Sequence, residues 1–226
     1  PQQAVVFEST RHTEEAGEQR IFPLNPQVTN EQGEVVYPVG TDTNAPRRQP
    51  SGVAEIWAWE VGDQDITRIT HDVRNDFAPA VWGDNVVWQK AKGWPFGWEI
   101  MALIGDQQMQ LTTNYYYDMA PKVHGSKVVW YGWDGFDYEI YLVDTEKGEL
   151  TQITSNRYDD VAPQVWNNTI VWEGYPAVEA DIYMWKDGTT TKLSSNVDDD
   201  LYPRIWGDKI VWQGFDGDDF EIYLYD

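Results

Sequence analysis

Short apolar stretches alternate with turn residues along this chain, and the alternation repeats. Four segments share the pattern Pro-x-Val/Ile-x-Gly-Asp-x-Ile/Val-Val-Trp, with small departures: residues 79–88, 121–130, 163–172 and 203–212. Their prolines lie 42, 42 and 40 residues apart. A weaker copy begins at Pro26 and continues to Val35-Val36-Tyr37, with two extra residues in its turn. A fixed period of about 40 residues indicates a repeat architecture.

Each copy predicts a tight β-hairpin, because its apolar and β-branched stretches flank two residues that tolerate positive φ. The central pairs are Gly83-Asp84, Gly125-Ser126, Asn167-Asn168 and Gly207-Asp208. A third strand is predicted after each hairpin, beginning at Glu55, Glu99, Glu139, Asp181 and Glu221. A fourth, polar strand ends most units, at residues 66–70, 110–112, 151–154 and 191–194.

Four short antiparallel strands in each repeat are typical of a β-propeller blade. We therefore predict an all-β fold, a β-propeller of five blades with four antiparallel strands each. Residues 1–226 form one domain, with repeats at about 26–70, 71–113, 114–154, 155–194 and 195–226. The last repeat stops at its third strand, so we expect a closing strand from residues 1–25, either 4–7 or 20–22, to complete it and close the ring. Six blades is the alternative, because residues 5–7 and 20–22 also match a second and a third strand.

The repeat resembles the TolB-like propeller family and its relatives in bacterial and archaeal envelope proteins. The resemblance rests on the Pro-to-Trp motif and on the segment Asp216-Gly217-Asp218-Asp219-Phe220-Glu221-Ile222-Tyr223-Leu224-Tyr225-Asp226, and it covers residues 55–226. It implies an extracytoplasmic interaction module in an extracellular, cell-surface or periplasmic place. The motif is specific for architecture and weak for activity.

The charge narrows the choice of partners. The net charge is −22, from 38 acidic and 16 basic residues, which argues against binding nucleic acid or an anionic membrane surface. No apolar stretch approaches the length of about 18 residues that membrane insertion needs. The chain has no cysteine, so disulfides and thiol chemistry are excluded. We expect a protein or a glycan as partner, with further domains of a longer chain or copies of the chain itself as alternatives.

Motifs for catalysis are missing from the sequence. It contains no Gly-x-Ser-x-Gly, His-Glu-x-x-His or phosphate-binding glycine motif. We therefore predict a binding protein rather than an enzyme, with no catalytic residue. One enzymatic alternative stays open, a glycosidase or polysaccharide lyase with a central carboxylate pair.

The loops between the second and third strands differ from repeat to repeat, and such variation on a constant frame is where function tends to lie. Their aromatic residues are candidate contacts for a sugar ring or a protein surface: Trp94, Trp98, Trp133, Tyr175 and Phe215. The alternative is that these rings pack within their own loops. Trp88, Trp130, Trp172 and Trp212, on the second strands, are expected to pack between blades.

One aspartate lies three residues before each repeat proline: Asp76, Asp118, Asp160 and Asp200. If the first strands line a central channel, these carboxylates form a partial ring that can bind a cation or a polyol. The competing interpretation is loop capping, in which each carboxylate accepts hydrogen bonds from nearby backbone N–H groups.

Two Asp-Gly loops place carboxylates at short spacing and are weak candidates for calcium: Asp134, Asp137 and Glu139, and Asp216, Asp218 and Glu221. Calcium takes six to eight oxygen ligands, and carboxylates with backbone carbonyls can supply them. The competing interpretation is that these are turn residues. Calcium is therefore the one cofactor that the sequence suggests.

Together these patterns predict a rigid, acidic propeller that binds a protein or a glycan through loops at one face, and the resemblance implies that it is extracytoplasmic. The alternatives are a lectin with several sugar sites and a subunit that assembles with copies of itself. Repeated equivalent pockets favour the lectin. A flat apolar side patch or an open strand edge favours self-assembly.

Overall fold

The computed structural model describes residues 4–10, 28–29, 35–36, 53–60, 65–93, 97–194 and 196–226. Every regular element within these residues is a β-strand, and none of these residues belongs to a helix able to cross a membrane. The all-β prediction is confirmed.

The sheets are numbered along the chain, and the first one, which contains the N-terminal strand, is described below. The next three sheets are four-stranded and antiparallel, with their strands in chain order. The second sheet consists of β6 (Asp76–Trp82), β7 (Asn85–Ala91), β8 (Trp98–Ile104) and β9 (Gln107–Gln110). The third consists of β10 (Asp118–His124), β11 (Lys127–Trp133), β12 (Tyr138–Asp144) and β13 (Glu149–Gln152). The fourth consists of β14 (Asp160–Trp166), β15 (Thr169–Gly174), β16 (Asp181–Lys186) and β17 (Thr189–Lys192). The last sheet has three strands, β18 (Asp200–Trp206), β19 (Lys209–Phe215) and β20 (Phe220–Tyr225).

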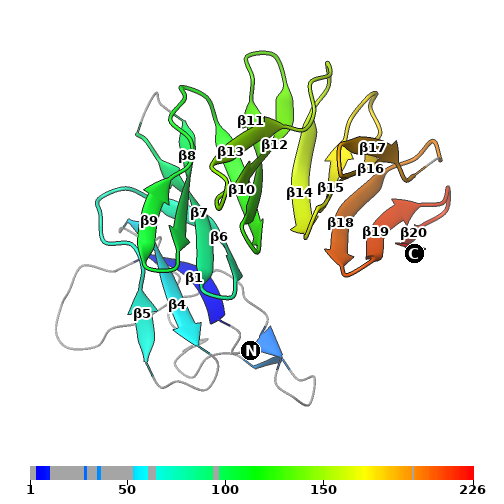
Figure 1. Cartoon of the computed structure of the whole chain (residues 1–226). Helices are drawn as coiled ribbons and strands as arrows, with labels where there is room; N and C mark the ends of the chain where they lie inside the picture. The colour runs from blue at the N-terminus through cyan, green and yellow to red at the C-terminus, as the bar shows by residue number, and fades with distance from the viewer. Residues whose placement is uncertain are drawn as a thin grey trace.

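The sheets follow one another around an arc, and the first strands of neighbouring sheets, β6, β10, β14 and β18, contact one another (Figure 1). The sheet that contains β4 (Ala54–Glu60) lies at one end of the arc and the sheet that contains β20 lies at the other. The described residues do not close the arc into a ring.

The N-terminal strand differs from its prediction. β1 (Ala4–Thr10) pairs along β4, which pairs on its other side with β5 (Ile66–Arg68), so β1 does not complete the last sheet as expected. Phe7 lies opposite Trp57 in the same register that places Trp88 opposite Met101 in the second sheet. Residues 5–7 match the Val-Val-Trp of a second strand, and they pair with β4 as a second strand pairs with a third. The candidate closing strand at residues 20–22 lies outside the described residues.

The weaker first copy of the motif forms a hairpin apart from the repeat. β2 (Val28–Thr29) and β3 (Val35–Val36) pair with each other in a two-stranded sheet of their own. Because β1 already occupies the edge of β4, this hairpin does not provide the first two strands of the first sheet. The expected assignment of the repeat over residues 26–70 is therefore wrong for its first two strands.

The backbone conformation of the hairpin turns and of the first strands explains why glycine, asparagine and proline recur at fixed places in the repeat. The first turn residue has a positive φ in each motif, at Gly83, Gly125, Asn167 and Gly207. Each first strand also contains a β-bulge just before the repeat proline, where Ala78, Ala120, Ala162 and Tyr202 have φ between 50° and 57°. Proline fits beside a bulge because it has no N–H to donate to the ladder.

The core lies between adjacent sheets. Val87, Ile100 and Ala102 of the second sheet pack against the buried Val128 and Trp130 of the third. The same contact recurs at the next two boundaries, with Trp172 and then Trp212 as the aromatic member. Trp88, Trp130, Trp172 and Trp212 are all buried, so the prediction that they pack between neighbouring repeats is confirmed.

Candidate functional site

The four repeated aspartates are buried, and each accepts a hydrogen bond from a tryptophan twelve residues later. The indole Nε1 donors lie 2.7 to 3.0 Å from Oδ1, in the pairs Trp88–Asp76, Trp130–Asp118, Trp172–Asp160 and Trp212–Asp200. Burial raises the pKa of all four carboxyls, and that of Asp76 and of Asp160 to about 6. An indole therefore takes the place of the backbone N–H expected for loop capping, and Asp118 and Asp160 also accept the side-chain amides of Asn114 and Asn156. The ring at a channel mouth stays a prediction.

Three of these aspartates, Asp118, Asp160 and Asp200, lie opposite a glycine that leaves room for the buried pair, whereas Asp76 lies opposite Lys90. A Cβ added at Gly174 would lie 2.6 Å from Oδ1 of Asp160 and 2.8 Å from the ring of Tyr183. Gly132 and Gly214 are crowded in the same way by an aspartate and a tyrosine. The tyrosine rings stack on the indoles in the pairs Trp130–Tyr141, Trp172–Tyr183 and Trp212–Tyr223.

Those loop aromatics predicted as ligand contacts that the structure describes make separate local contacts. Trp98 packs edge-on against Phe77, and Phe215 packs against Phe220 of its own hairpin. The hydroxyl of Tyr175 donates to Oε2 of Glu173 at 3.1 Å. Trp94 lies outside the described residues. Trp133 lines an open cleft.

This cleft has a volume of about 350 Å³ and is lined by aromatic side chains of the third sheet and its loops: Tyr115, Tyr116, Tyr117, Trp133 and Tyr138. We call it the tyrosine cleft. Tyr115 is 80% exposed, and Tyr116 and Tyr117 are 44% and 45% exposed. Large exposed aromatic side chains are enriched where proteins bind ligands or one another.

Hydrogen bonds and a ring contact hold the walls of the tyrosine cleft in place. The N–H of Trp133 donates to the carbonyl of Tyr117 at 3.0 Å, which joins the two loops. Oδ1 of Asn114 accepts the N–H of Tyr116 at 2.6 Å. Trp133 and Tyr138 pack edge-to-face with ring centroids 5.2 Å apart. The cleft is therefore preorganised, which lowers the entropic cost of binding.

The sequence prediction missed Tyr115, Tyr116 and Tyr117, because it rested only on the loops between second and third strands. These residues precede the first strand of the third sheet. The equivalent triplets before the other first strands are Val73-Arg74-Asn75, Arg157-Tyr158-Asp159 and Val197-Asp198-Asp199. The run of three tyrosines departs from the repeat, and that departure was the available signal.

A row of aromatic rings lies at the C-terminal ends of the first strands β6, β10, β14 and β18. Trp82 contacts His124, His124 contacts Trp166, and Trp166 contacts Trp206, with ring centroids 4.2 to 4.8 Å apart. The row joins four consecutive sheets. His124 is buried, its Nδ1 accepts the N–H of Asn167 at 3.1 Å, and burial lowers its pKa.

The first candidate calcium trio comes together. Carboxylate oxygens of Asp134, Asp137 and Glu139 lie within 4.8 Å of one another, and Asp137 and Glu139 are buried. Burial raises the pKa of Asp137, and it raises the pKa of Glu139 to about 7. The first residue, Asp134, also accepts the N–H groups of Phe136 and Asp137 in a turn.

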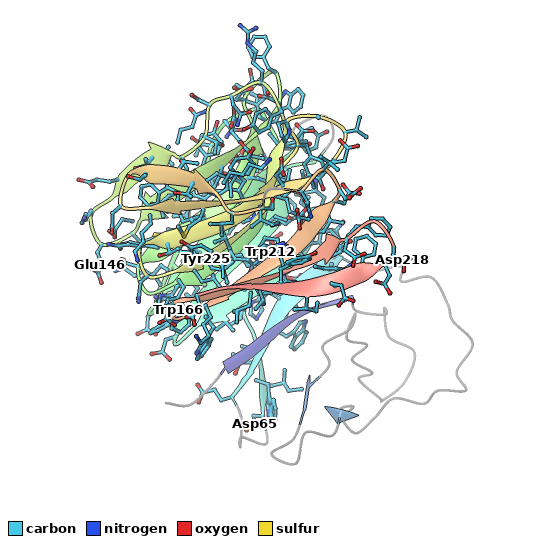
Figure 2. The ribbon with its side chains drawn as sticks, turned by 90° about the vertical axis from the view of Figure 1, so that its right-hand side faces the viewer. Asp65, Glu146, Trp166, Trp212, Asp218 and Tyr225 are labelled. Carbon is cyan, nitrogen blue, oxygen red and sulfur yellow. The ribbon has the colours of Figure 1, made fainter. Side chains whose placement is uncertain are left out.

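The second trio differs from its prediction by one residue. Asp216 and Glu221 gather with Asp219 rather than with Asp218, and all three are exposed. Asp219 occupies the place in its loop that Asp137 occupies in the third sheet. Asp218 donates its backbone N–H to Oδ1 of Asp216 and lies at the tip of the loop (Figure 2).

No protein-family model matches the chain, and no curated protein matches it significantly. Among solved structures it is similar to the β-propeller domain of the Trilobed protease from Pyrococcus furiosus, with a TM-score of 0.54 and 18% identity over 68% of this chain and 51% of that one. The fold is a β-propeller. The propeller is also similar to TolB from Acinetobacter baumannii, with a TM-score of 0.57 and 12% identity over 76% and 46% of the two chains.

A Pyrococcus horikoshii acylaminoacyl peptidase gives a TM-score of 0.64 and 13% identity over 99% of this propeller and 35% of that chain. The propeller thus spans about half the length, or less, of these solved structures. At these identities the similarity shows the fold alone, so function has to be argued from the site.

Proposed function

We propose that this propeller is a non-catalytic binding domain, and that the tyrosine cleft receives a segment of a partner protein. The observation that carries the proposal is the group of exposed Tyr115, Tyr116 and Tyr117 beside Trp133. Tyrosine and tryptophan give a large contact area at a low cost in conformational entropy, and they dominate the energetics of many interfaces.

The charge of the chain supports a neutral or basic partner segment. With a net charge of −22, long-range attraction favours positive surfaces and speeds their association. Asp159 flanks the loops of the cleft, and its Oδ1 accepts the N–H of Tyr138 at 3.0 Å. A lysine or arginine of the partner would meet this carboxylate at the edge of the aromatic wall.

Two features of the tyrosine cleft favour this function over the other functional classes. A multivalent lectin needs equivalent pockets in several blades, whereas the three tyrosines occur in one repeat only. A glycosidase or lyase needs two carboxyl groups beside the substrate, whereas aromatic side chains line the tyrosine cleft. We therefore infer a binding domain without catalytic residues.

The finer architectural and cellular assignments are part of the same proposal. We count five blades, one for each of the five successive sheets that begin with β1, β6, β10, β14 and β18. The resemblance of the repeat to the TolB-like family supports an extracytoplasmic place in the envelope. It also supports interaction, rather than catalysis, as the role of the domain.

Selection of peptides and glycans tests the proposal. We would screen the purified chain against a displayed peptide library and a glycan array, then remeasure the best ligand with Tyr115→Ser/Tyr117→Ser. The matched control is Tyr202→Ala, which removes another exposed tyrosine and restores the alanine found at that position in three other repeats. Peptide binding that is lost only in the double variant supports the proposal. Hits on glycans alone, or peptide binding that survives the double variant, contradict it.

A second candidate, self-assembly, rests on the open side of the last sheet (Figure 2). Ile222 and Leu224 are 75% and 58% exposed, although their counterparts Ile182 and Leu142 are buried between sheets. Strand β20 has no fourth strand beside it in the described part of the chain. We infer that a second copy of this chain covers this face. Light scattering over a range of concentrations tests this: an association abolished by Ile222→Glu supports it, and a monomer at every concentration contradicts it.

A further inference from the structure

One repeat position holds a buried acid at the start of the third strand in four successive sheets. These acids are Glu55, Glu99, Glu139 and Asp181. Each lies beside a threonine or serine hydroxyl: Thr70, Thr112, Thr154 and Ser194. A buried carboxylate is costly unless a positive charge and hydrogen bonds compensate it.

Three of the four acids have a basic partner. Arg68 pairs with Glu55 at 2.5 Å, Lys192 pairs with Asp181 at 2.7 Å, and Lys92 pairs with Glu99. Arg68 and Lys192 reach their acids from the fourth strand. Lys92 reaches its acid from the loop after the second strand, two residues beyond Lys90, which lies opposite Glu99.

Glu139 is the exception. The fourth-strand position that holds Arg68 and Lys192 is Gln152 in the third sheet, as the strand registers show. The loop position of Lys92 is Asp134, two residues beyond Gly132, which lies opposite Glu139. Within the described residues Glu139 makes no ion pair, and the loop that supplies a cation in the second sheet supplies further acids instead.

One carboxylate oxygen of each of the two buried acids of this loop lacks a hydrogen-bond donor within the described residues. Glu139 is fully buried; its Oε1 accepts the N–H of Asn156 at 2.7 Å, and its Oε2 has no hydrogen-bond donor among the described residues. Asp137 is 7% exposed, and in that part of the chain its Oδ1 also has none. Both residues belong to the trio whose oxygens lie within 4.8 Å of one another.

We propose that a divalent cation of the calcium class binds Asp134, Asp137 and Glu139 and takes the place that a basic side chain holds in the neighbouring sheets. An all-carboxylate set is a hard oxygen site, which favours calcium over the metals that prefer nitrogen or sulfur. Backbone carbonyls and water complete the coordination. Glu139 and Asp137 bind the ion at the base of the loop, and the less buried Asp134 covers it.

The site goes beyond the proposed function but adjoins it. Tyr138 lies between Asp137 and Glu139, and Trp133 precedes Asp134, so the ion fixes the loop that forms one wall of the tyrosine cleft. The three tyrosines at residues 115–117 contribute no carboxylate. Loss of cation binding and loss of partner binding are therefore separately observable.

Calorimetric titration of Ca²⁺ into the chelator-treated full chain is the test, with Tb³⁺ luminescence excited through Trp133 as a second readout. Asp134→Lys supplies the ammonium that Lys92 supplies in the second sheet. We expect it to fold, to weaken Ca²⁺ binding at least about tenfold, and to melt in EDTA at or above the temperature of the wild type. Glu139→Gln, which keeps the shape of the side chain, is expected to lose the same binding event.

The matched control lies in the last sheet. Asp216→Lys changes the equivalent residue of the exposed trio and should leave the binding event at Glu139 unchanged. Binding that is weakened at least about tenfold in Asp134→Lys, lost in Glu139→Gln and retained in Asp216→Lys supports the proposal. A folded chain without saturable Ca²⁺ binding overturns it, as does binding that survives Glu139→Gln or is lost with Asp216→Lys alone.

Discussion

Substitution of Asp76 by asparagine should stabilise the propeller at neutral pH. Asp76 is fully buried, its Oδ1 accepts the indole N–H of Trp88 at 2.9 Å, and its Oδ2 has no hydrogen-bond donor in the described part of the chain. Asparagine keeps the acceptor for the indole and removes the charge. It also provides an amide that can donate to the hydroxyl of Thr70, which lies close to this carboxyl.

The magnitude follows from the pKa. Burial raises the pKa of Asp76 from 3.8 to about 6, so the folded state holds this proton more tightly than the unfolded chain does. The stabilisation from this group is complete below about pH 4 and is lost as the pH rises through about 6. The difference of about two units corresponds to about 3 kcal/mol, and this net shift already includes the opposing field of Lys90.

Thermal unfolding of the wild type and of Asp76→Asn at pH 4 and at pH 8 measures this difference. For a chain of this size we expect the variant to melt about 5 °C higher at pH 8, and the gap to close or reverse at pH 4. Using the difference between the two proteins removes the contribution of the other raised carboxyls. A gap of the same size and sign at both pH values would refute the reasoning, because it would mean that the Asp76 proton is not linked to folding.

Two further predictions concern the repeat itself. Gly174→Ala should lower the free energy of unfolding by about 1 to 3 kcal/mol, because the added Cβ meets Asp160 and Tyr183. Adding Tyr183→Met, which introduces the residue type of Met101 at the equivalent position of the second sheet, should recover part of this loss. Urea titrations of the two variants measure both changes. Full stability in the single variant would show that the buried pair can move aside. At concentrations where the chain is monomeric, Ile222→Glu on the open face should change stability by less than about 0.5 kcal/mol, whereas Ile182→Glu at the equivalent buried place should cost more than about 3 kcal/mol. Equal effects would mean that the last sheet is covered in the monomer.

The repeat predicted most of the fold because its signals are local. Turn residues with positive φ, β-branched strands and tryptophans at a constant place specify the hairpins and the inter-sheet core without knowledge of distant contacts. The partner of β1 was not predictable in this way. Residues 5–7 match a second strand, but which third strand they meet depends on a chain separation of about fifty residues and on competition with the hairpin at Val28–Val36.

The candidate site was predicted less completely, because part of it depends on contacts between segments that are apart in the sequence. The acidic trio at Asp134, Asp137 and Glu139 is a local feature of one loop and was found. The role of Asp76 and its equivalents depends on a contact across two strands, although the constant separation of twelve residues from a tryptophan was visible in the sequence. The tyrosine cleft combines two loops from different parts of one repeat, so it appears only when the strands are paired.

The central claim is that one blade binds a partner through the tyrosine cleft. The most direct measurement is the affinity of the best selected peptide for the wild type, for Tyr115→Ser/Tyr117→Ser and for Tyr202→Ala. We predict that the double variant binds at least about a hundredfold more weakly, since an interface tyrosine of this kind contributes about 2 kcal/mol or more. The control should bind like the wild type. Equal affinity in all three proteins would contradict the claim and place the binding surface elsewhere on the propeller.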